Sequence, residues 1–443
     1  MNTPEALASW NQTVRGFLAH SSDVPGHLQE TLRLAPDFPL AMASKGLFCL
    51  LLARREMVQT AHEDRRQAMK GGQPLDAREK AYIAALDHWL AGSPIAAAER
   101  LDALLVDFPA DALTLKLAHA IRFMLGDLSG MRTSLERVRH AYTSDHPAFG
   151  YVNGCYAFAL EETGEYDRAE TVGRMAVEHT PDDAWGVHAV AHVHEMTGES
   201  ERGIRWLTGN PQGWAHCNNF GNHMWWHLAL MRLDRGAIDA VLNLYDTRIR
   251  HEHTDDYRDI ANAASLLSRL QMEGVDVGSR WDELADFSSG RTQDDCLVFA
   301  DLHYMLALVG GNRDDAVAKL LGRLQNSAAR GKSDMDRIAA AAGVPGALGL
   351  QAFQCGNYAG AYSGLKRLST NLQQIGGSHA QRDVFEQILA EAAMRSGHLE
   401  DARQLLDERL SRRGGHDGFA LRRLALLDGV VQSQEAQLAP TGT

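Results

Sequence analysis

The stretch GEYDRAETVGRMAVEHTPDDAWGVHAVAHVHEMTGES, residues 164–200, decides the fold. It starts at a turn glycine, Gly164, and reaches a second turn of the same kind at Gly198. Between the two glycines, small and apolar residues recur at helical spacing, and Pro181 marks the point where one helix must stop. The stretch therefore predicts two helices joined by a tight turn.

The same pattern extends toward the N-terminus. Glycine turns also occur at Gly92 and Gly126, and only the interval from Gly126 to Gly164 is longer than the others. A helix-turn-helix pattern with a period of about 34 residues is typical of tetratricopeptide repeats (TPR). Small residues stand where paired helices pack most closely: Ala85, Ala97, Ala157, Ala169 and Ala191. We predict an all-α, right-handed TPR-like solenoid with helix-turn-helix pairs at 78–111, 112–149, 150–183 and 184–217.

The second half also has a helical pattern, but its period is longer. Turns followed by alanine begin at Gly311, Gly356 and Gly397, and the intervals between them exceed those of the first half. We expect one continuous superhelix with four parts: an N-terminal helical cap over 1–77, TPR-like repeats over 78–250, C-terminal TPR-like repeats over 251–431 and a flexible tail over 432–443. An array of this length can curl until it closes.

Composition excludes several classes of protein. The chain has 443 residues and a net charge of −13, which is unfavourable for a nucleic-acid binder. Its five cysteines lie far apart, which argues against a disulfide framework. The N-terminus carries no signal-peptide pattern, and no apolar stretch is long enough for a membrane helix. We expect a cytoplasmic protein without nucleic-acid or membrane partners. The oligomeric state stays open.

Several polar residues are expected on the concave face. With the turn glycine at repeat position 15, positions 2, 5, 9 and 12 of each first helix point into the groove. In repeat 184–217 these are Trp185, His188, His192 and Glu195. The previous first helix adds Glu161 and Glu162, and the following helix adds His223, Trp226 and His227. We predict that these nine residues contact a ligand.

Two of these helices carry an HxxxH pair, His188/His192 and His223/His227. Histidines at this spacing lie on one helical face, close enough to bind one metal ion. With a carboxylate such as Glu195 or Glu161, the set suits Zn, Fe or Mn. HxxxH alone is a weak signal, so two alternatives stay open: a polar pocket without metal, and structural packing against aromatic rings.

A second polar group follows Gly376 and Gly377. Ser378 and Gln381 form a capping-box pattern at a helix start, and Arg382 can hold an anion there. The alternative is that Ser378 only caps the helix while Arg382 and Asp383 pair with neighbouring helices. We hypothesise that this segment, with His379, closes the groove opposite the HxxxH helices and so encloses a pocket.

These motifs together resemble those of the tetratricopeptide repeat protein 38 family. The similar stretches are DAWGVHAVAHVHEM (183–196), HMWWHLAL (223–230), LYD (244–246) and IGGSHAQRDVF (375–385). The resemblance covers roughly positions 30–412. It implies a helical TPR superhelix and assigns His188, His192, Glu195, His223, Trp226, His227, Ser378, His379, Arg382 and Asp383 to family motifs. It implies no settled activity.

Three functions are compatible with the sequence. The first is binding of a small polar ligand or short peptide in a concave pocket lined by His, Trp and Glu. The second is a metal-dependent enzyme, hydrolytic or oxidative, whose catalytic candidates are His188, His192, Glu195 and His379. The third is a protein–protein scaffold. Metal content and the effect of replacing His188 and His192 distinguish them.

Overall fold

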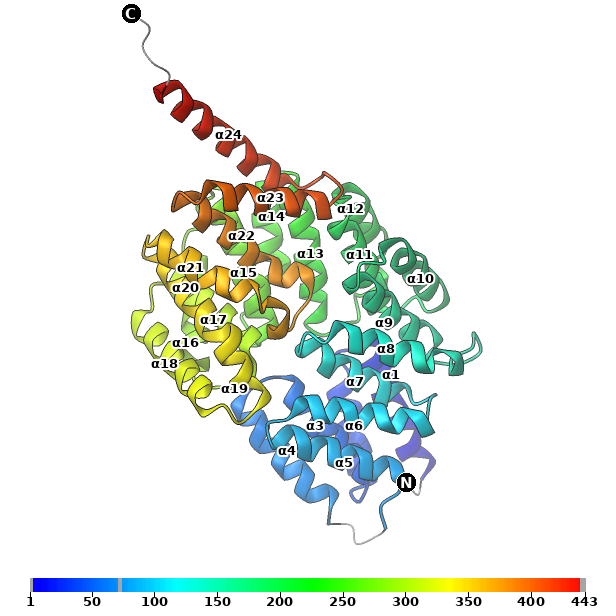
Figure 1. The fold of residues 1–443 in the computed structure, drawn as a ribbon. Helices are drawn as coiled ribbons and strands as arrows, with labels where there is room; N and C mark the ends of the chain where they lie inside the picture. The colour runs from blue at the N-terminus through cyan, green and yellow to red at the C-terminus, as the bar shows by residue number, and fades with distance from the viewer. Residues whose placement is uncertain (1–2, 71–73, 439–443) are drawn as a thin grey trace, which may run out of the picture.

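The computed structural model describes residues 3–70 and 74–438, and within this part the regular elements are helices, joined by one isolated β-bridge between Ser21 and Cys217 (Figure 1). The elements are α1 (Pro4–Ala19), α2 (Val24–Leu34), α3 (Pro39–Leu51), α4 (Arg55–Ala68), α5 (Ala77–Leu90), α6 (Pro94–Asp107), α7 (Ala112–Met124), α8 (Leu128–Val138), η1 (Arg139–Ala141), α9 (Phe149–Glu162), α10 (Tyr166–His179), α11 (Ala184–Met196), α12 (Ser200–Gly209), η2 (Pro211–Gly213), α13 (Phe220–Asp234), α14 (Ile238–Leu244), η3 (Tyr245–Ile249), α15 (Tyr257–Met272), α16 (Arg280–Arg291), α17 (Val298–Gly310), α18 (Asp314–Arg330), α19 (Asp334–Ile338), η4 (Ala339–Gly343), α20 (Val344–Gln354), α21 (Tyr358–Ser369), η5 (Leu372–Ile375), α22 (His379–Arg395), α23 (Leu399–Arg412) and α24 (Gly418–Leu438).

The predicted helix pairs are confirmed. They are α5/α6, α7/α8, α9/α10 and α11/α12, and the glycine between the two helices of each pair has a positive φ, from 65° at Gly126 to 84° at Gly164. The alanines expected at the close-packed positions are fully buried. The second pair is longer mainly because the loop between η1 and α9, residues 142–148, exceeds the loops that follow α6 and α10.

The looser period of the second half comes from inserted elements. The short helix α19 and the π-helical turn η4 lie between α18 and α20. The 3₁₀ turn η5 and the following loop lie between α21 and α22. These insertions lengthen the repeats without changing the alternation of paired helices, so the all-α superhelix predicted for the chain is confirmed.

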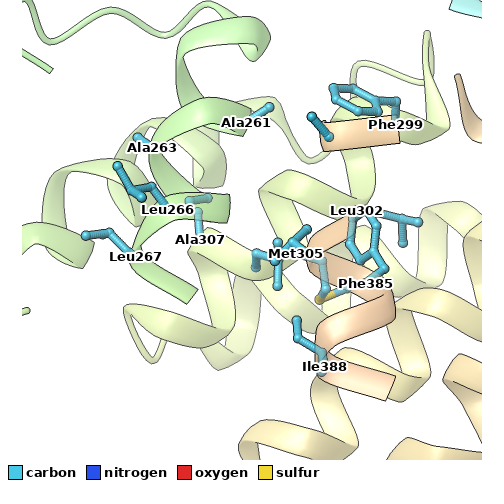
Figure 2. Close-up of a cluster of buried hydrophobic side chains, with 14 of the residues drawn as sticks. Ala261, Ala263, Leu266, Leu267, Phe299, Leu302, Met305, Ala307, Phe385 and Ile388 are labelled. Atoms are coloured by element: carbon cyan, nitrogen blue, oxygen red, sulfur yellow. The ribbon is translucent and has the colours of Figure 1, made fainter. Parts of the chain in front are cut away.

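The core of the second half is apolar and joins distant segments. Helices α15, α17 and α22 meet there, as Figure 2 shows. The shared cluster includes Leu266 of α15, Leu302 and Met305 of α17, and Phe385 and Ile388 of α22. Because α22 contacts the much earlier helix α15 directly, the superhelix is tightly wound.

Further contacts close the superhelix on itself. The Gln373 side chain donates to the backbone carbonyl of Gly126 at 2.8 Å. Arg54 pairs with Asp255 at 2.8 Å, and the Gly418 N–H donates to the Asp234 carboxylate at 2.8 Å. Early and late repeats therefore touch directly, so the interior is enclosed by helices from both halves.

The flexible tail predicted over 432–443 falls partly on the last described helix. Helix α24 continues to Leu438, and it extends away from the body in Figure 1. Residues 439–443 lie outside the described part of the chain, as do 1–2 and 71–73. Within the described residues, no helix combines the length and apolarity that a membrane span requires.

Candidate functional site

Helices α11 and α13 carry the two HxxxH pairs, and the structure brings both pairs together. His188, His192, His223 and His227 each offer a ring nitrogen, and these four nitrogens lie within 4.8 Å of one another. All four side chains are buried. The helical spacing places each pair on one face of its helix, and the two faces point toward each other.

Three of these rings converge tightly. The Nε2 atom of His188 lies 3.0 Å from Nε2 of His223 and 3.1 Å from Nε2 of His227. Nε2 of His223 and Nε2 of His227 are themselves 3.1 Å apart. The three nitrogens thus form a nearly equilateral triangle, which we call the three-histidine triangle.

The outer nitrogens of two rings each lie beside a side-chain oxygen. Nδ1 of His227 lies 2.9 Å from Glu195 Oε2, and Nδ1 of His223 lies 2.9 Å from Asn262 Oδ1. With these oxygens as acceptors, each Nδ1 carries the hydrogen, and each Nε2 of a neutral ring presents a lone pair. The contact between His223 and His227 then has no proton to share, so two lone pairs face each other at 3.1 Å.

A metal ion bound between these nitrogens would remove the conflict between the lone pairs. With metal–nitrogen bonds of about 2.0–2.1 Å, nitrogens of a tetrahedral site lie about 3.3 Å apart, close to the spacing of the triangle. Metal-binding histidines usually donate their outer N–H to a carboxylate or amide oxygen, as His227 and His223 do. Burial, followed by the neighbouring imidazoles, lowers the pKa of His223 well below its ordinary value, so its ring is neutral and able to bind a cation.

Behind the triangle lies an acidic pair from the end of α9. Glu161 is fully buried, and neither of its carboxylate oxygens has a hydrogen-bond partner. Its Oε2 lies 3.4 Å from Nδ1 of His192, whose two ring nitrogens also lack hydrogen-bond partners. Burial and then the charge of Glu162 raise the pKa of Glu161 well above its ordinary value. A nearby divalent cation would favour its ionised form.

The 376–383 segment contacts this acidic pair. The backbone N–H of His379 donates to Glu162 Oε1 at 2.8 Å, and Arg382 donates to Glu162 Oε2 at 3.2 Å. Ser378 and Gln381 form the predicted capping box. Arg382 also donates to the carbonyl of Gly377, so it is occupied within the protein and not free to hold an anionic ligand.

Next to the triangle is a cavity of about 730 Å³, within the range of small-molecule sites. Of the nine residues expected on the concave face, Trp185, His188 and His223 line it. The other six are buried and lie outside this lining: Glu161, Glu162, His192, Glu195, Trp226 and His227.

Several residues of the cavity lining were not predicted from the sequence. The helix α7, one repeat before α9, contributes Lys116, Ala120 and Phe123, which all line the cavity. His20 contributes from the end of α1, far from the repeats in sequence. The repeat pattern could have identified the α7 residues, whereas no sequence signal points to His20.

Asp183, directly before α11, provides a pH-dependent contribution to stability. It is fully buried, and burial raises its pKa from 3.8 to about 7. Folding then takes up a proton, so stability falls as pH rises between these values, by at most about 1.4 kcal/mol per pH unit. We expect Asp183→Asn to flatten the pH dependence of the unfolding free energy, measured by urea titration from pH 4 to 8. Asp182→Asn, at the partly exposed neighbour, is the control. If the unfolding free energy of Asp183→Asn changes with pH as steeply as that of the wild type, the raised pKa of Asp183 is contradicted.

No model of a known protein family matches the chain. Similar solved structures include yeast Tom70, with 12% identity and a TM-score of 0.35 over 99% of this chain and 91% of that chain. The human IFIT1 dimer with m7Gppp-AAAA has 11% identity and a TM-score of 0.37, over 95% of each chain. The Naa15/Naa10 structure bound to HypK-THB has 12% identity and a TM-score of 0.26, over 92% of this chain and 63% of that chain. These are helical repeat proteins, and likeness at this level implies nothing about the site.

Proposed function

We propose that this protein is a metal-dependent enzyme whose metal is held by His188, His223 and His227 and whose substrate is a small molecule in the adjoining cavity. The observation that carries the proposal is the three-histidine triangle, with its nitrogens 3.0 to 3.1 Å apart and two of its outer nitrogens tied to oxygen acceptors. A divalent first-row ion is the expected metal, and three imidazoles suit Zn²⁺ well.

The position of the triangle favours catalysis over a purely structural metal. His188 and His223 belong to the cavity wall, so an ion at their Nε2 atoms would lie within reach of a bound molecule. Three protein ligands leave a coordination position for water or substrate. Such an ion polarises a substrate oxygen or lowers the pKa of bound water to about 7. His192 and Glu161 supply a further nitrogen and a carboxylate beside it.

The proposal includes membership of the tetratricopeptide repeat protein 38 family and a cytoplasmic location. Its support is that the motifs similar to that family converge at one place, although His188 and the 376–383 segment lie far apart in the sequence. A small molecule is favoured over a peptide or protein partner because the polar residues expected in an open groove are buried.

Metal analysis tests this function directly. The full chain, purified without a histidine tag or chelator, is expected to contain about one divalent ion per chain by plasma mass spectrometry. His223→Ala and His227→Ala are expected to lose at least nine-tenths of it, since each removes a ligand. The control is His194→Gln on helix α11, a buried histidine that contacts Glu199 and Arg174 instead of the triangle. Absence of bound metal after incubation with Zn²⁺, Fe²⁺ or Mn²⁺ would contradict the proposal.

A further inference from the structure

The residues lining the cavity form two chemically distinct groups. One is apolar and comes largely from α1, α2 and α3, where Phe17 and Phe48 stack with ring centroids 4.3 Å apart and Leu28 and Leu32 lie nearby. The other surrounds the ring of Trp185 and carries polar atoms. A molecule that fills the cavity must therefore be apolar over one part and polar over another.

The charge of the lining is one-sided. Among the described residues that line the cavity there is no Asp or Glu, although the protein has a net charge of −13. The lining includes three cations, Lys45, Lys116 and Arg258. Lys45 is paired with Asp64 at 2.6 Å, and Arg258 with Asp256 at 2.7 Å. Lys116 is thus the one cation of this lining for which the described residues provide no ion pair.

Lys116 is held in an unusual environment for a charged group. Its side chain is buried, with its ammonium 4.3 Å from the centroid of the Trp185 ring and 3.5 Å from the sulfur of Cys155. Burial raises the pKa of the Cys155 thiol, so this thiol supplies no negative charge. The buried carboxyl of Asp183 also acts on Lys116 electrostatically, but the described residues show no ion pair between them, and burial raises the pKa of Asp183 to about 7. The buried ammonium is therefore only partly compensated, and a ligand that brings an anion lowers the cost of burying it.

Hydrogen-bond donors surround the same place. Nε2 of His20, both ring nitrogens of His119 and Nε1 of Trp185 are buried without partners. The ring centroids of His20 and His119 lie 5.1 and 6.0 Å from that of Trp185, so these groups and Lys116 form one cluster. Each can donate a hydrogen to an oxygen, and together they match an acceptor that has two oxygens and one negative charge.

We infer that the cavity binds a small molecule with a carboxylate, which pairs with Lys116 beside Trp185, and an apolar body, which lies against the side chains of α1–α3. As a statement about the substrate class, the inference rests on the proposed function. One unpaired cation among neutral donors matches a carboxylate monoanion better than a phosphate dianion. His188 contacts Trp185, with ring centroids 4.9 Å apart, so the carboxylate would lie next to the three-histidine triangle.

Calorimetric titration of the full chain with octanoate, octanol and octyl phosphate tests the inference. Octanoate is expected to bind saturably and at least tenfold more tightly than octanol, because octanoate carries a negative charge that neutralises Lys116 and octanol carries none. Lys116→Met keeps the length of the side chain and removes the unpaired buried charge, so we expect a folded variant. It should bind octanoate at least tenfold more weakly and octanol unchanged.

Lys45→Met is the matched control, since Lys45 lines the same cavity but is already neutralised by Asp64. Its octanoate affinity is expected to change less than threefold. Equal affinity for octanoate and octanol, equal or tighter binding of octyl phosphate, or unchanged octanoate binding by Lys116→Met would each overturn the inference.

Titration of the His223→Ala variant with octanoate tests the carboxylate site separately from the metal site. Octanoate binding that persists there and still depends on Lys116 supports the carboxylate site whether or not the protein holds metal. Metal-containing wild-type protein that fails to bind octanoate overturns the carboxylate site and leaves the proposed function standing.

Discussion

Replacing Asp383 with asparagine is expected to lower the free energy of unfolding by about 3–5 kcal/mol. The Asp383 carboxylate is buried and accepts hydrogen bonds from three guanidinium groups, those of Arg409, of Arg413 at 3.3 Å and of Arg269 at 3.4 Å. Asparagine keeps the shape but leaves buried positive charges that Asp417 only partly neutralises. Because these arginines come from α15 and from α23 and its C-terminal end, the loss loosens the contact of three segments.

The pH dependence of this variant has a defined sign. Although burial opposes ionisation, Arg409, Arg413 and Arg269 hold the pKa of Asp383 well below its usual range. The stabilisation is therefore present above the ordinary carboxyl pKa of about 3.9 and is lost as pH falls below it. Urea unfolding should show wild-type protein and Asp383→Asn differing at pH 7 and converging in acid.

Glu386→Gln is the matched control for Asp383→Asn. Glu386 lies on the same helix α22 and pairs with Arg412 of α23 at 2.8 Å, but this pair is partly exposed. Exposed ion pairs contribute about 0–1 kcal/mol, so a small effect is expected. Equal losses in the two variants would show that burial of the Asp383 network adds nothing.

Gly126→Ala is expected to lower the free energy of unfolding by about 2–5 kcal/mol, which is the sum of a conformational and a steric part. Gly126 has a φ of 65°, which costs an L-residue about 1–2 kcal/mol. Its added Cβ would also overlap the carbonyl oxygen of Gln373, where the second half closes onto the first. Relief requires backbone movement, at about 1–3 kcal/mol. Thermal and urea unfolding of Gly126→Ala measure the total.

Gly164→Ala separates the closing contact from the local strain. Gly164 stands in the corresponding turn of the next repeat with a φ of 84°, and nothing lies within 4 Å of an added Cβ. Gly164→Ala should therefore lower the free energy of unfolding only by the conformational part, about 1–2 kcal/mol. If Gly126→Ala is no less stable than Gly164→Ala, the contact between Gln373 and Gly126 contributes nothing to closure.

The helical repeats were predictable because they depend on local chemistry. Glycine at the turns adopts a positive φ at low cost, alanine at Ala157 and Ala191 lets paired helices approach, and Pro181 ends a helix. Each of these constraints acts within one repeat, so the residues of that repeat are enough to predict it. The inserted elements α19 and η4 escaped prediction because they interrupt the period where no repeat pattern applies.

The site was predictable only in part. Helical spacing alone placed His188 and His192 on one face and identified His223 and His227 as their counterparts. It could not predict that Nε2 atoms of two helices would approach to 3.0 Å, because that distance depends on the packing of α11 against α13. Nor could it indicate that Arg382 is occupied by Glu162, which belongs to the distant helix α9.

By itself, the sequence determined the fold class, the boundaries of the first repeats and the residues of the two HxxxH pairs, since each follows from interactions within a helix or between adjacent helices. The tertiary structure decided which of these residues line the cavity and which lie behind it, and it added Lys116 and His20. The physical reason is the curvature of the superhelix. Small rotations between successive pairs accumulate over the whole chain until its two halves meet, and no local sequence pattern specifies their sum.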